Sequence, residues 1–172
     1  ILGLGCDLSD LTIGIIGLGS IGIEISKRAR AFGMRIIAYT PHEKKIEGVT
    51  LVSFEELIRE SDIVSLSCPA LPSTHHLINS EVLSKMKPTS FIVNFSRGSV
   101  IDTEALVLSL KLKQIAGAAL DVYEIEPLPL DHELYKLNNV LLFPHFGTMT
   151  KDAEEKTAVV LSKRIIKALS MN

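Results

Sequence analysis

Short apolar runs recur along the chain and predict strands. Each run is brief, bounded by glycine, proline or polar residues, and most are rich in β-branched side chains. Their apolar residues are continuous rather than alternating, which is typical of strands buried on both faces of a sheet. The runs lie at 12–16, 35–39, 63–66, 91–94, 115–120 and 140–143.

Segments of helical periodicity separate these runs. Strands that alternate with helices predict parallel βαβ units, so the expected fold class is α/β, a doubly wound parallel sheet in three αβα layers. One long irregular stretch, at 122–139, holds several prolines and acids, and loops of that length are often functional. The predicted helices run from the glycine-rich turn at 17–22 to Gly33, from 53 to about 60, from 79 or 80 to before Pro88, from 102 or 103 to about 112, and from 150 to 170.

Glycines recur at Gly17, Gly19 and Gly22, directly after the first predicted strand and at the start of a helix. In that context Gly17 permits a tight turn, Gly19 lets the backbone approach a pyrophosphate, and Gly22 lets the helix pack on the strand. The helix start, with Ser20 and Ile21, would present free N–H groups to phosphate oxygens, and the Ser20 hydroxyl would add a contact. The pattern predicts a Rossmann fold that binds NAD or NADP.

The residue that ends the second predicted strand, Thr40, indicates which dinucleotide is bound. NAD-binding domains carry an acid about 20 residues after the glycines, where it holds the ribose hydroxyls. Thr40 has no charge to repel a 2′-phosphate, and the basic residues His42, Lys44 and Lys45 follow it. We therefore expect a slight preference for NADP, with dual use or a merely solvated basic loop as the alternatives.

Composition narrows the possible function classes. Charged residues make up 22% of the chain and the formal net charge is -2, which gives no basic footprint for nucleic acid. The apolar stretches are too short and too interrupted to span a membrane. Cys6 and Cys68 form no Cys-x-x-Cys pair, so we expect neither zinc nor disulfides, and a cytoplasmic location. We interpret His75, His76 and His132 as structural, and expect no metal site.

Several motifs, in order along the chain, resemble those of the D-2-hydroxyacid dehydrogenases and together span nearly all of it. The segment FIVNFSRGSVID is similar to that family's signature around its catalytic arginine, and AGAALDVYEIEP to the signature around its glutamate. The segment NVLLFPHFG resembles the one that carries its histidine. The resembling segments are 17–22 with 32–34, 57–66, Cys68-Pro69 with Thr74, 79–87, 91–102, 116–127 and 139–147.

The resemblance implies a catalytic set of Arg97, Glu126 and His145. Arg97 would bind the carboxylate and carbonyl oxygen of a 2-oxo acid, for which a planar guanidinium fork is suited. His145 would exchange a proton with that oxygen as hydride moves, and Glu126 would pair with His145. Asp121 would hold the nicotinamide carboxamide. The remaining cofactor contacts that the resemblance implies are Cys68, Pro69, Thr74, Phe95, Ser96, Arg97, His145 and Gly147.

A few residues depart from the family pattern. Thr40 replaces the usual acid, which bears on the choice of cofactor. Phe146 follows the histidine where smaller aliphatic residues are common, so the substrate pocket is expected to be reshaped. Lys113 stands where the family usually has glycine, and a positive φ there would cost about 1 kcal/mol of stability.

The resemblance also implies a domain organisation. Residues 1–150 would form the dinucleotide-binding domain, and 151–172 a C-terminal helix that packs on a substrate domain absent from this chain. The chain begins at Ile1 without an initiator methionine, so we expect a fragment that binds cofactor but turns over substrate poorly. Related cofactor domains dimerise, and a homodimer is expected. The last helix would expose an apolar stripe of Ala158, Leu161, Ile165, Ala168 and Leu169.

The expected function is hydride transfer between NAD(P)H and a small 2-oxo acid, with glyoxylate or hydroxypyruvate, 3-phosphoglycerate and D-lactate pairs all open. The alternative is an NAD(P)-sensing, dimerising binding module similar to the dehydrogenase-like transcriptional corepressors, which keep the same catalytic set. Formate dehydrogenase is a third possibility, ranked low because that enzyme has glutamine in place of the acid at Glu126.

Overall fold

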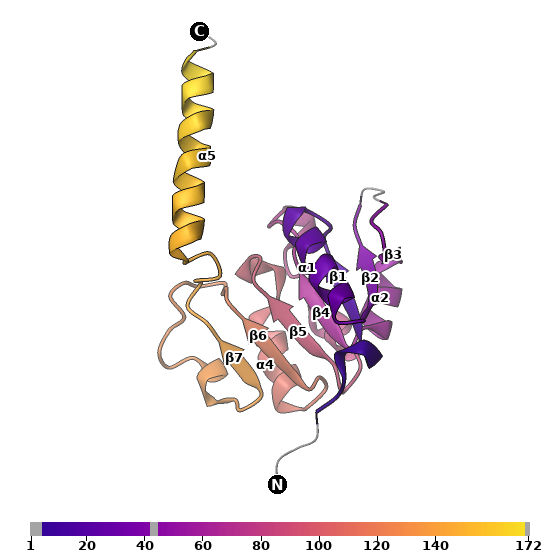
Figure 1. Ribbon diagram of the computed structural model, residues 1–172. Helices are drawn as coiled ribbons and strands as arrows, with labels where there is room; N and C mark the ends of the chain where they lie inside the picture. The colour runs from indigo at the N-terminus through magenta and orange to yellow at the C-terminus, as the bar shows by residue number, and fades with distance from the viewer. Residues whose placement is uncertain (1–4, 42–44, 171–172) are drawn as a thin grey trace.

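The computed structural model describes residues 5–41 and 45–170, and within them the chain folds around one parallel sheet (Figure 1). The strand order is β3-β2-β1-β4-β5-β6-β7, and each neighbouring pair is parallel. This confirms the doubly wound α/β fold. The strands are β1 (Thr12–Ile16), β2 (Arg35–Tyr39), β3 (Thr50–Leu51), β4 (Ile63–Leu66), β5 (Phe91–Asn94), β6 (Gly117–Leu120) and β7 (Val140–Leu142).

The helices begin where short polar side chains supply the missing backbone partners. The Ser53 hydroxyl accepts a hydrogen bond from the N–H of Glu56, and the side chains of Asn79 and Asp102 cap their helices in the same way. Gly33, with φ 76°, follows the first helix as predicted. The helices are α1 (Ser20–Ala31), α2 (Phe54–Glu60), α3 (Ser80–Ser84), α4 (Thr103–Lys111) and α5 (Lys151–Leu169), with single 3₁₀ turns η1 (Leu8–Asp10), η2 (Pro72–Thr74), η3 (Gly98–Val100) and η4 (Glu133–Lys136).

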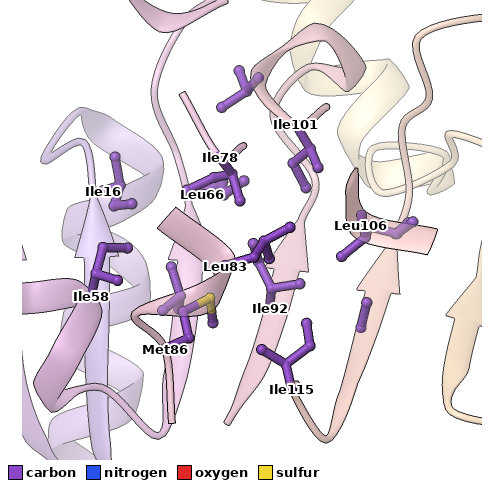
Figure 2. Close-up of a cluster of buried hydrophobic side chains, with 14 of the residues drawn as sticks. Ile16, Ile58, Leu66, Ile78, Leu83, Met86, Ile92, Ile101, Leu106 and Ile115 are labelled. Atoms are coloured by element: carbon purple, nitrogen blue, oxygen red, sulfur yellow. The ribbon is translucent and has the colours of Figure 1, made fainter. Parts of the chain in front are cut away.

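The main core lies between the sheet and helices α2, α3 and α4 (Figure 2). Leu57, Leu83 and Leu106, one from each helix, are almost fully buried. Helix α1 lies on the opposite face against β1 and β2, where Ile15 and Ala29 belong to a smaller cluster. Truncating one buried leucine of such a core to alanine lowers the free energy of unfolding by about 2–5 kcal/mol. The packing of the main core therefore holds the strands in place.

The face of the sheet that carries α1 is only partly covered. Over β5, β6 and β7 a groove of about 420 Å³ is lined by Phe91, Val93, Ala119 and Leu141, among others. Phe91 is 49% exposed and Leu141 is 63% exposed. The prediction that the strands are buried on both faces therefore holds for β1 and β2, and is wrong for this part of the sheet within residues 5–41 and 45–170.

Helix α5 extends away from the sheet (Figure 1). The Thr150 hydroxyl accepts a hydrogen bond from the N–H of Ala153, which confirms the predicted helix start. None of the residues of α5 is buried, and the predicted apolar stripe is exposed, with Leu161 at 56% and Ile165 at 50%. Across the described part of the chain, no helix combines the length and the apolarity that a membrane span requires.

Two strands differ from their predictions by more than one residue. β6 begins at Gly117 rather than at 115, because Ile115 lies in the turn that follows α4 and is buried there in the core. β3 was not predicted, since it is a two-residue strand with both side chains exposed and gives no periodic signal. It pairs with β2 through Ile37 and Ala38.

Lys113, just after α4, has a left-handed φ of 55°. This is the conformation in which a lysine in place of glycine is expected to cost stability. Replacing it with glycine removes the clash between Cβ and the following carbonyl, so we expect Lys113→Gly to raise the free energy of unfolding by about 1 kcal/mol. Urea unfolding followed by circular dichroism measures this change. Gly33→Ala is the matched control at another left-handed position, and it should destabilise the chain. A destabilised Lys113→Gly variant would contradict the strain argument.

Candidate functional site

The predicted site residues gather at one edge of the sheet because all the strands are parallel and end on the same side. Ligands bind at this edge in open α/β sheets, beside the strand where the order reverses. That strand is β1, which pairs with both β2 and β4. The residues follow β1 (Gly17), β2 (Thr40), β4 (Cys68), β5 (Ser96 and Arg97), β6 (Asp121) and β7 (His145).

The glycines of the first turn are required for two different reasons. A Cβ on Gly17, which has φ 98°, would lie 2.8 Å from the carbonyl oxygen of Ser67, and one on Gly22 would lie 2.1 Å from that of Gly17. These two glycines are therefore required by the packing of the chain itself. Among the residues that the structure describes, a Cβ on Gly19 would meet no atom within 4 Å, so the space in front of it is open there. Gly19 is the N-cap of α1, and as a glycine it offers the helix no side-chain hydrogen bond.

A cleft of about 490 Å³ opens beside this turn. An uncapped helix N-terminus next to an open cleft suits the pyrophosphate of a dinucleotide, because its N–H groups are unpaired and its dipole attracts anions. Ser20 and Ile21 are exposed on the first turn of α1. The cleft is lined by six residues of the predicted cofactor site, Gly17, Gly19, Thr40, Cys68, Pro69 and Thr74.

Two side chains of the loop after β4 line the cleft beside the glycine turn. The Thr74 hydroxyl donates to the carbonyl of Pro69 at 2.7 Å and accepts from the N–H of Leu71 at 2.8 Å, so it holds the loop after β4 closed on itself. Cys68 is buried, and burial raises the pKa of its thiol. Cys68 is therefore an inert apolar contact rather than a nucleophile.

Thr40 and Tyr39 form the end of the cleft at β2. Thr40 lines the cleft, and Tyr39 packs edge-on against Phe54 with ring centroids 5.5 Å apart. No carboxylate lines this cleft in the described part of the chain. The predicted contacts His42 and Lys44 lie outside the described residues, and Lys45 is exposed.

Arg97 is held at the end of β5 by a buried asparagine. The Asn94 side chain accepts from the N–H of Ser96 at 3.0 Å and donates to the carbonyl of Arg97 at 3.0 Å. The turn is fixed while the Arg97 side chain stays exposed, with its guanidinium donating to the carbonyl of Ser96 at 2.7 Å. The sequence analysis did not select Asn94, although a polar residue at the end of a buried strand was a signal for it.

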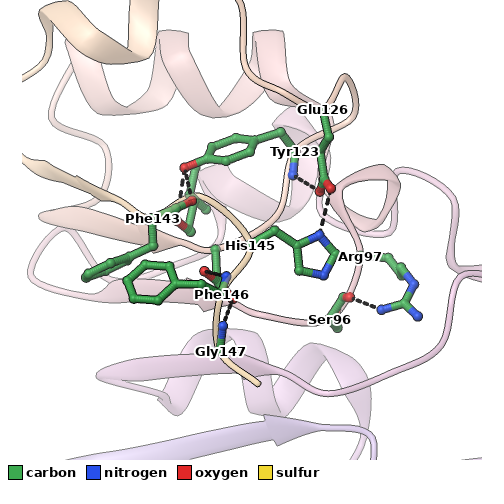
Figure 3. A network of polar contacts seen from close by, with 10 residues as sticks. Ser96, Arg97, Tyr123, Glu126, Phe143, His145, Phe146 and Gly147 are labelled. Atoms are coloured by element: carbon green, nitrogen blue, oxygen red, sulfur yellow. Dashed lines mark hydrogen bonds and ion pairs between the residues drawn. The ribbon is translucent and has the colours of Figure 1, made fainter. Parts of the chain in front are cut away.

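His145 and Glu126 form a hydrogen-bonded pair, with Nδ1 of the imidazole 2.6 Å from Oε2 of the carboxylate (Figure 3). The side chains are 49% and 35% exposed, so the pair is open to a ligand. The other Glu126 oxygen accepts from the N–H of Tyr123 at 3.0 Å, and the Tyr123 hydroxyl donates to the carbonyl of Phe143 at 2.8 Å. Tyr123, which the sequence analysis missed, thus joins the loop of Glu126 to the strand before His145.

The charges of the pair settle its tautomer. The hydrogen bond from His145, followed by that from the N–H of Tyr123, holds the pKa of Glu126 below its ordinary value of 4.5. The nearby Arg97 adds to this effect. An ionised carboxylate only accepts hydrogen bonds, so Nδ1 of His145 carries the hydrogen. The Nε2 atom is then left to exchange a proton with a ligand.

Asp121 holds the backbone turn that presents His145. His145 has a left-handed φ of 55°, a strained conformation for a residue with a Cβ. The two carboxylate oxygens of Asp121 accept from the N–H groups of Phe146 at 3.0 Å and Gly147 at 2.9 Å, directly after that strained position. A second groove, of about 340 Å³, is lined by three predicted cofactor residues among others, Phe95, Asp121 and Gly147. A role of Asp121 towards a nicotinamide stays a prediction.

Comparison with known proteins gives one family. The family model described as D-isomer specific 2-hydroxyacid dehydrogenase, NAD binding domain, matches residues 3–147. The chain is 45% identical over 167 residues to a glyoxylate reductase of Thermococcus litoralis, covering 95% of this chain and 50% of that protein. It is 43% identical to a D-3-phosphoglycerate dehydrogenase of Synechocystis, covering 94% of this chain and 30% of that protein. The chain thus spans about half or less of the length of these relatives.

Solved structures agree with the sequence matches. An acyclic imino acid reductase in complex with NADPH and D-Arg superposes with a TM-score of 0.92 at 34% identity, covering 98% of this chain and 54% of that one. The NAD-complexed form of a D-isomer specific 2-hydroxyacid dehydrogenase from Lactobacillus delbrueckii superposes with a TM-score of 0.88 at 30% identity, covering 97% and 55%.

The lowered pKa of Glu126 predicts a pH dependence of stability. The folded chain favours ionised Glu126, so this contribution is present above pH 4.5, the ordinary value, and is lost as pH falls through the lower folded value. We expect Glu126→Gln to lose less stability than the wild type on acidification below about pH 4.5. Urea unfolding at a series of pH values measures this. Glu104→Gln, on the exposed side of α4, should keep the wild-type slope, and an equal slope in Glu126→Gln would contradict the prediction.

Proposed function

The chain belongs to the D-isomer specific 2-hydroxyacid dehydrogenases through their NAD-binding domain, and on that premise we propose that it binds NAD(P)H and supplies the acid–base group for reduction of a small 2-oxo acid. The proposal also covers the reverse oxidation of a D-2-hydroxy acid. The observation that carries it is the pair of His145 and Glu126, with Nδ1 and Oε2 2.6 Å apart, at the same sheet edge as Arg97 and the glycine turn.

The bound cofactor would supply the hydride, and the residues of the chain would handle charge and proton. Arg97 would pair with the substrate carboxylate, since its exposed guanidinium carries further N–H donors beyond the one bonded to the carbonyl of Ser96. His145 would donate a proton from Nε2 to the carbonyl oxygen as that oxygen gains charge. Glu126 would stabilise the imidazolium before transfer and keep the ring oriented.

The cofactor site is proposed along the edge of the sheet. The pyrophosphate would lie on the open space before Gly19 and the start of α1, and the adenosine half in the 490 Å³ cleft that Thr40 lines. The nicotinamide would lie towards the groove of Asp121 and Phe95, next to His145. Thr40 supports the slight preference for NADP, because it lacks a charge that would repel a 2′-phosphate.

The remaining expectations are proposals of the same kind. We propose residues 1–150 as the cofactor domain and 151–172 as a helix that packs on a surface outside that domain. The exposed apolar stripe of α5 supports this division. A homodimer and a cytoplasmic location remain proposals, the latter supported by the free thiols of Cys6 and Cys68. The relatives reported above are named as enzymes, which favours catalysis over an NAD(P)-sensing module.

Cofactor choice is tested by calorimetric titration of the chain with NADPH and NADH. We expect NADPH to bind about tenfold more tightly, a difference of about 1.4 kcal/mol. Lys44→Ala should remove this preference by weakening NADPH alone, while Lys163→Ala on α5 is the charge-matched control. Gly19→Leu should abolish binding of both cofactors without lowering the unfolding temperature, since a Cβ at this position meets no atom of the described residues within 4 Å. Tighter NADH binding would mean that Thr40 serves the ribose alone.

The acid–base role is tested by NADPH oxidation with glyoxylate, hydroxypyruvate and pyruvate. The wild-type rate is itself expected to be low, and His145→Gln, which removes the acid–base group, should lower it further, by about 10²–10⁴-fold. Its affinity for NADPH, measured by calorimetry, should fall far less than kcat, because His145 is only one of the predicted cofactor contacts. His132→Gln is the matched control, since that imidazole belongs to the residue just before η4 and accepts a hydrogen bond from the N–H of Leu134 instead. An active His145→Gln variant would overturn the proposed mechanism, whichever substrate is reduced.

A further inference from the structure

A second histidine–glutamate pair takes its glutamate from the same loop as the proposed catalytic pair. The Nε2 atom of His76 is 2.6 Å from Oε1 of Glu124, and the side chains are 36% and 31% exposed. Glu124 is two residues before Glu126 in the loop after β6. The sequence analysis interpreted His76 as structural, and the mechanism proposed above does not use it.

The carboxylate of Glu124 joins three loops at the functional edge. Its Oε1 atom bonds His76 from the loop after β4, and its Oε2 atom accepts from the N–H of Thr103, the first residue of α4, at 3.1 Å. Burial would raise the pKa of Glu124, but these hydrogen bonds outweigh it and hold the pKa below the ordinary value. Glu124 is thus an ionised acceptor between two fixed donors, one of which is a backbone group.

The two outer loops are also paired with each other. The N–H of His76 donates to the carbonyl of Ser99 at 2.8 Å, and Ile78 forms a parallel bridge with Ile101. His76 has a left-handed φ of 47°, so its backbone holds a strained conformation at this junction. The loops after β4 and β5 therefore behave as one unit, and Glu124 is the side chain that ties the loop after β6 to it.

Arg97 and Glu126 are linked through the backbone next to this tie. A Cβ on Gly98 would lie 1.9 Å from the carbonyl carbon of Tyr123 and 2.4 Å from the nitrogen of Glu124. The backbone after Arg97 is thus in direct contact with the backbone at 123–124. A shift of that segment would displace the turn of Arg97 and, through the N–H of Tyr123, the carboxylate of Glu126.

We propose that Glu124, held by His76, is a positioning residue that keeps the loop of Glu126 in register with the turn of Arg97. It acts through these neighbours and not on the substrate. The inference rests on the proposed function, because the alignment matters only if Glu126 and His145 form the acid–base pair. A displacement of about 1 Å at a reacting group can cost about 10²-fold in rate, so a tie of this kind has a functional effect larger than its effect on stability.

The test uses the ¹⁵N resonances of the His145 ring, which report whether Nδ1 keeps its hydrogen bond. Glu124→Gln keeps the shape of the side chain but removes its charge and one of its two acceptor oxygens, so the tie to His76 and Thr103 is weakened. We expect Glu124→Gln to shift the His145 resonances towards those of Glu126→Gln. Glu133→Gln, which removes two ion pairs from the same irregular stretch, should leave them unchanged.

Variants of His76 separate a tie from a merely structural contact. His76→Gln keeps an N–H donor and should retain the wild-type His145 resonances, whereas His76→Leu should reproduce the effect of Glu124→Gln. Urea midpoints are measured for every variant, and we expect Glu124→Gln and Glu133→Gln to unfold at similar concentrations. In the assay with glyoxylate, Glu124→Gln should lower kcat by about tenfold or more.

The outcomes distinguish the two proposals. Wild-type His145 resonances in Glu124→Gln, with altered ones in Glu126→Gln, would overturn the positioning role and leave the proposed function standing. Unaltered resonances in Glu126→Gln itself would show that the catalytic pair is wrong, and with it the proposed function. A His76→Gln variant that behaves like His76→Leu would also overturn the positioning role.

Discussion

The functional edge depends on the parallel pairing of the strands. Because β1 to β7 all run the same way, every loop that follows a strand emerges at one edge, and residues more than 100 positions apart, such as Gly17 and His145, lie along that edge. The pairing itself depends on the core beneath α2, α3 and α4, where side chains such as Leu57 and Ile92 are fully buried. Polar side chains at the edge therefore extend from a packed core, and most of their hydrogen bonds are to backbone groups of the loops.

Much of this arrangement could be predicted because its signals are local. Short apolar runs predict strands such as 63–66 and 91–94, and capping residues such as Ser53 and Asp102 indicate where helices begin. The parallel topology then follows from the alternation of strand and helix. Arg97, Glu126 and His145 were selected by resemblance to family motifs, and the topology is what brings them to one edge.

What could not be predicted depends on contacts between distant segments. Nothing near His76 in sequence indicates Glu124, 48 positions away, and the bond depends on how two loops pass each other. The strained φ of His145 is stabilised by Asp121, which lies 24 positions earlier in the sequence. The Asp121 carboxylate accepts hydrogen bonds from the N–H groups of the two residues that follow His145. The open face of the sheet at Phe91 could not be predicted from the hydrophobic pattern either. A strand with apolar side chains on both faces gives no information about which face another element covers.

The glycine turn shows why a sequence motif is weaker evidence for a bound ligand than the geometry of the turn itself. Gly17 and Gly22 are needed to fold this turn at all, since a Cβ at either would collide with backbone oxygen atoms of the chain. They would be required in any protein with the same sharp connection between strand and helix, whether or not it binds a ligand. Gly19 makes no such contact, so the fold alone would accept a side chain there. Gly19 and the uncapped start of α1 therefore favour a bound phosphate more strongly than the number of glycines does.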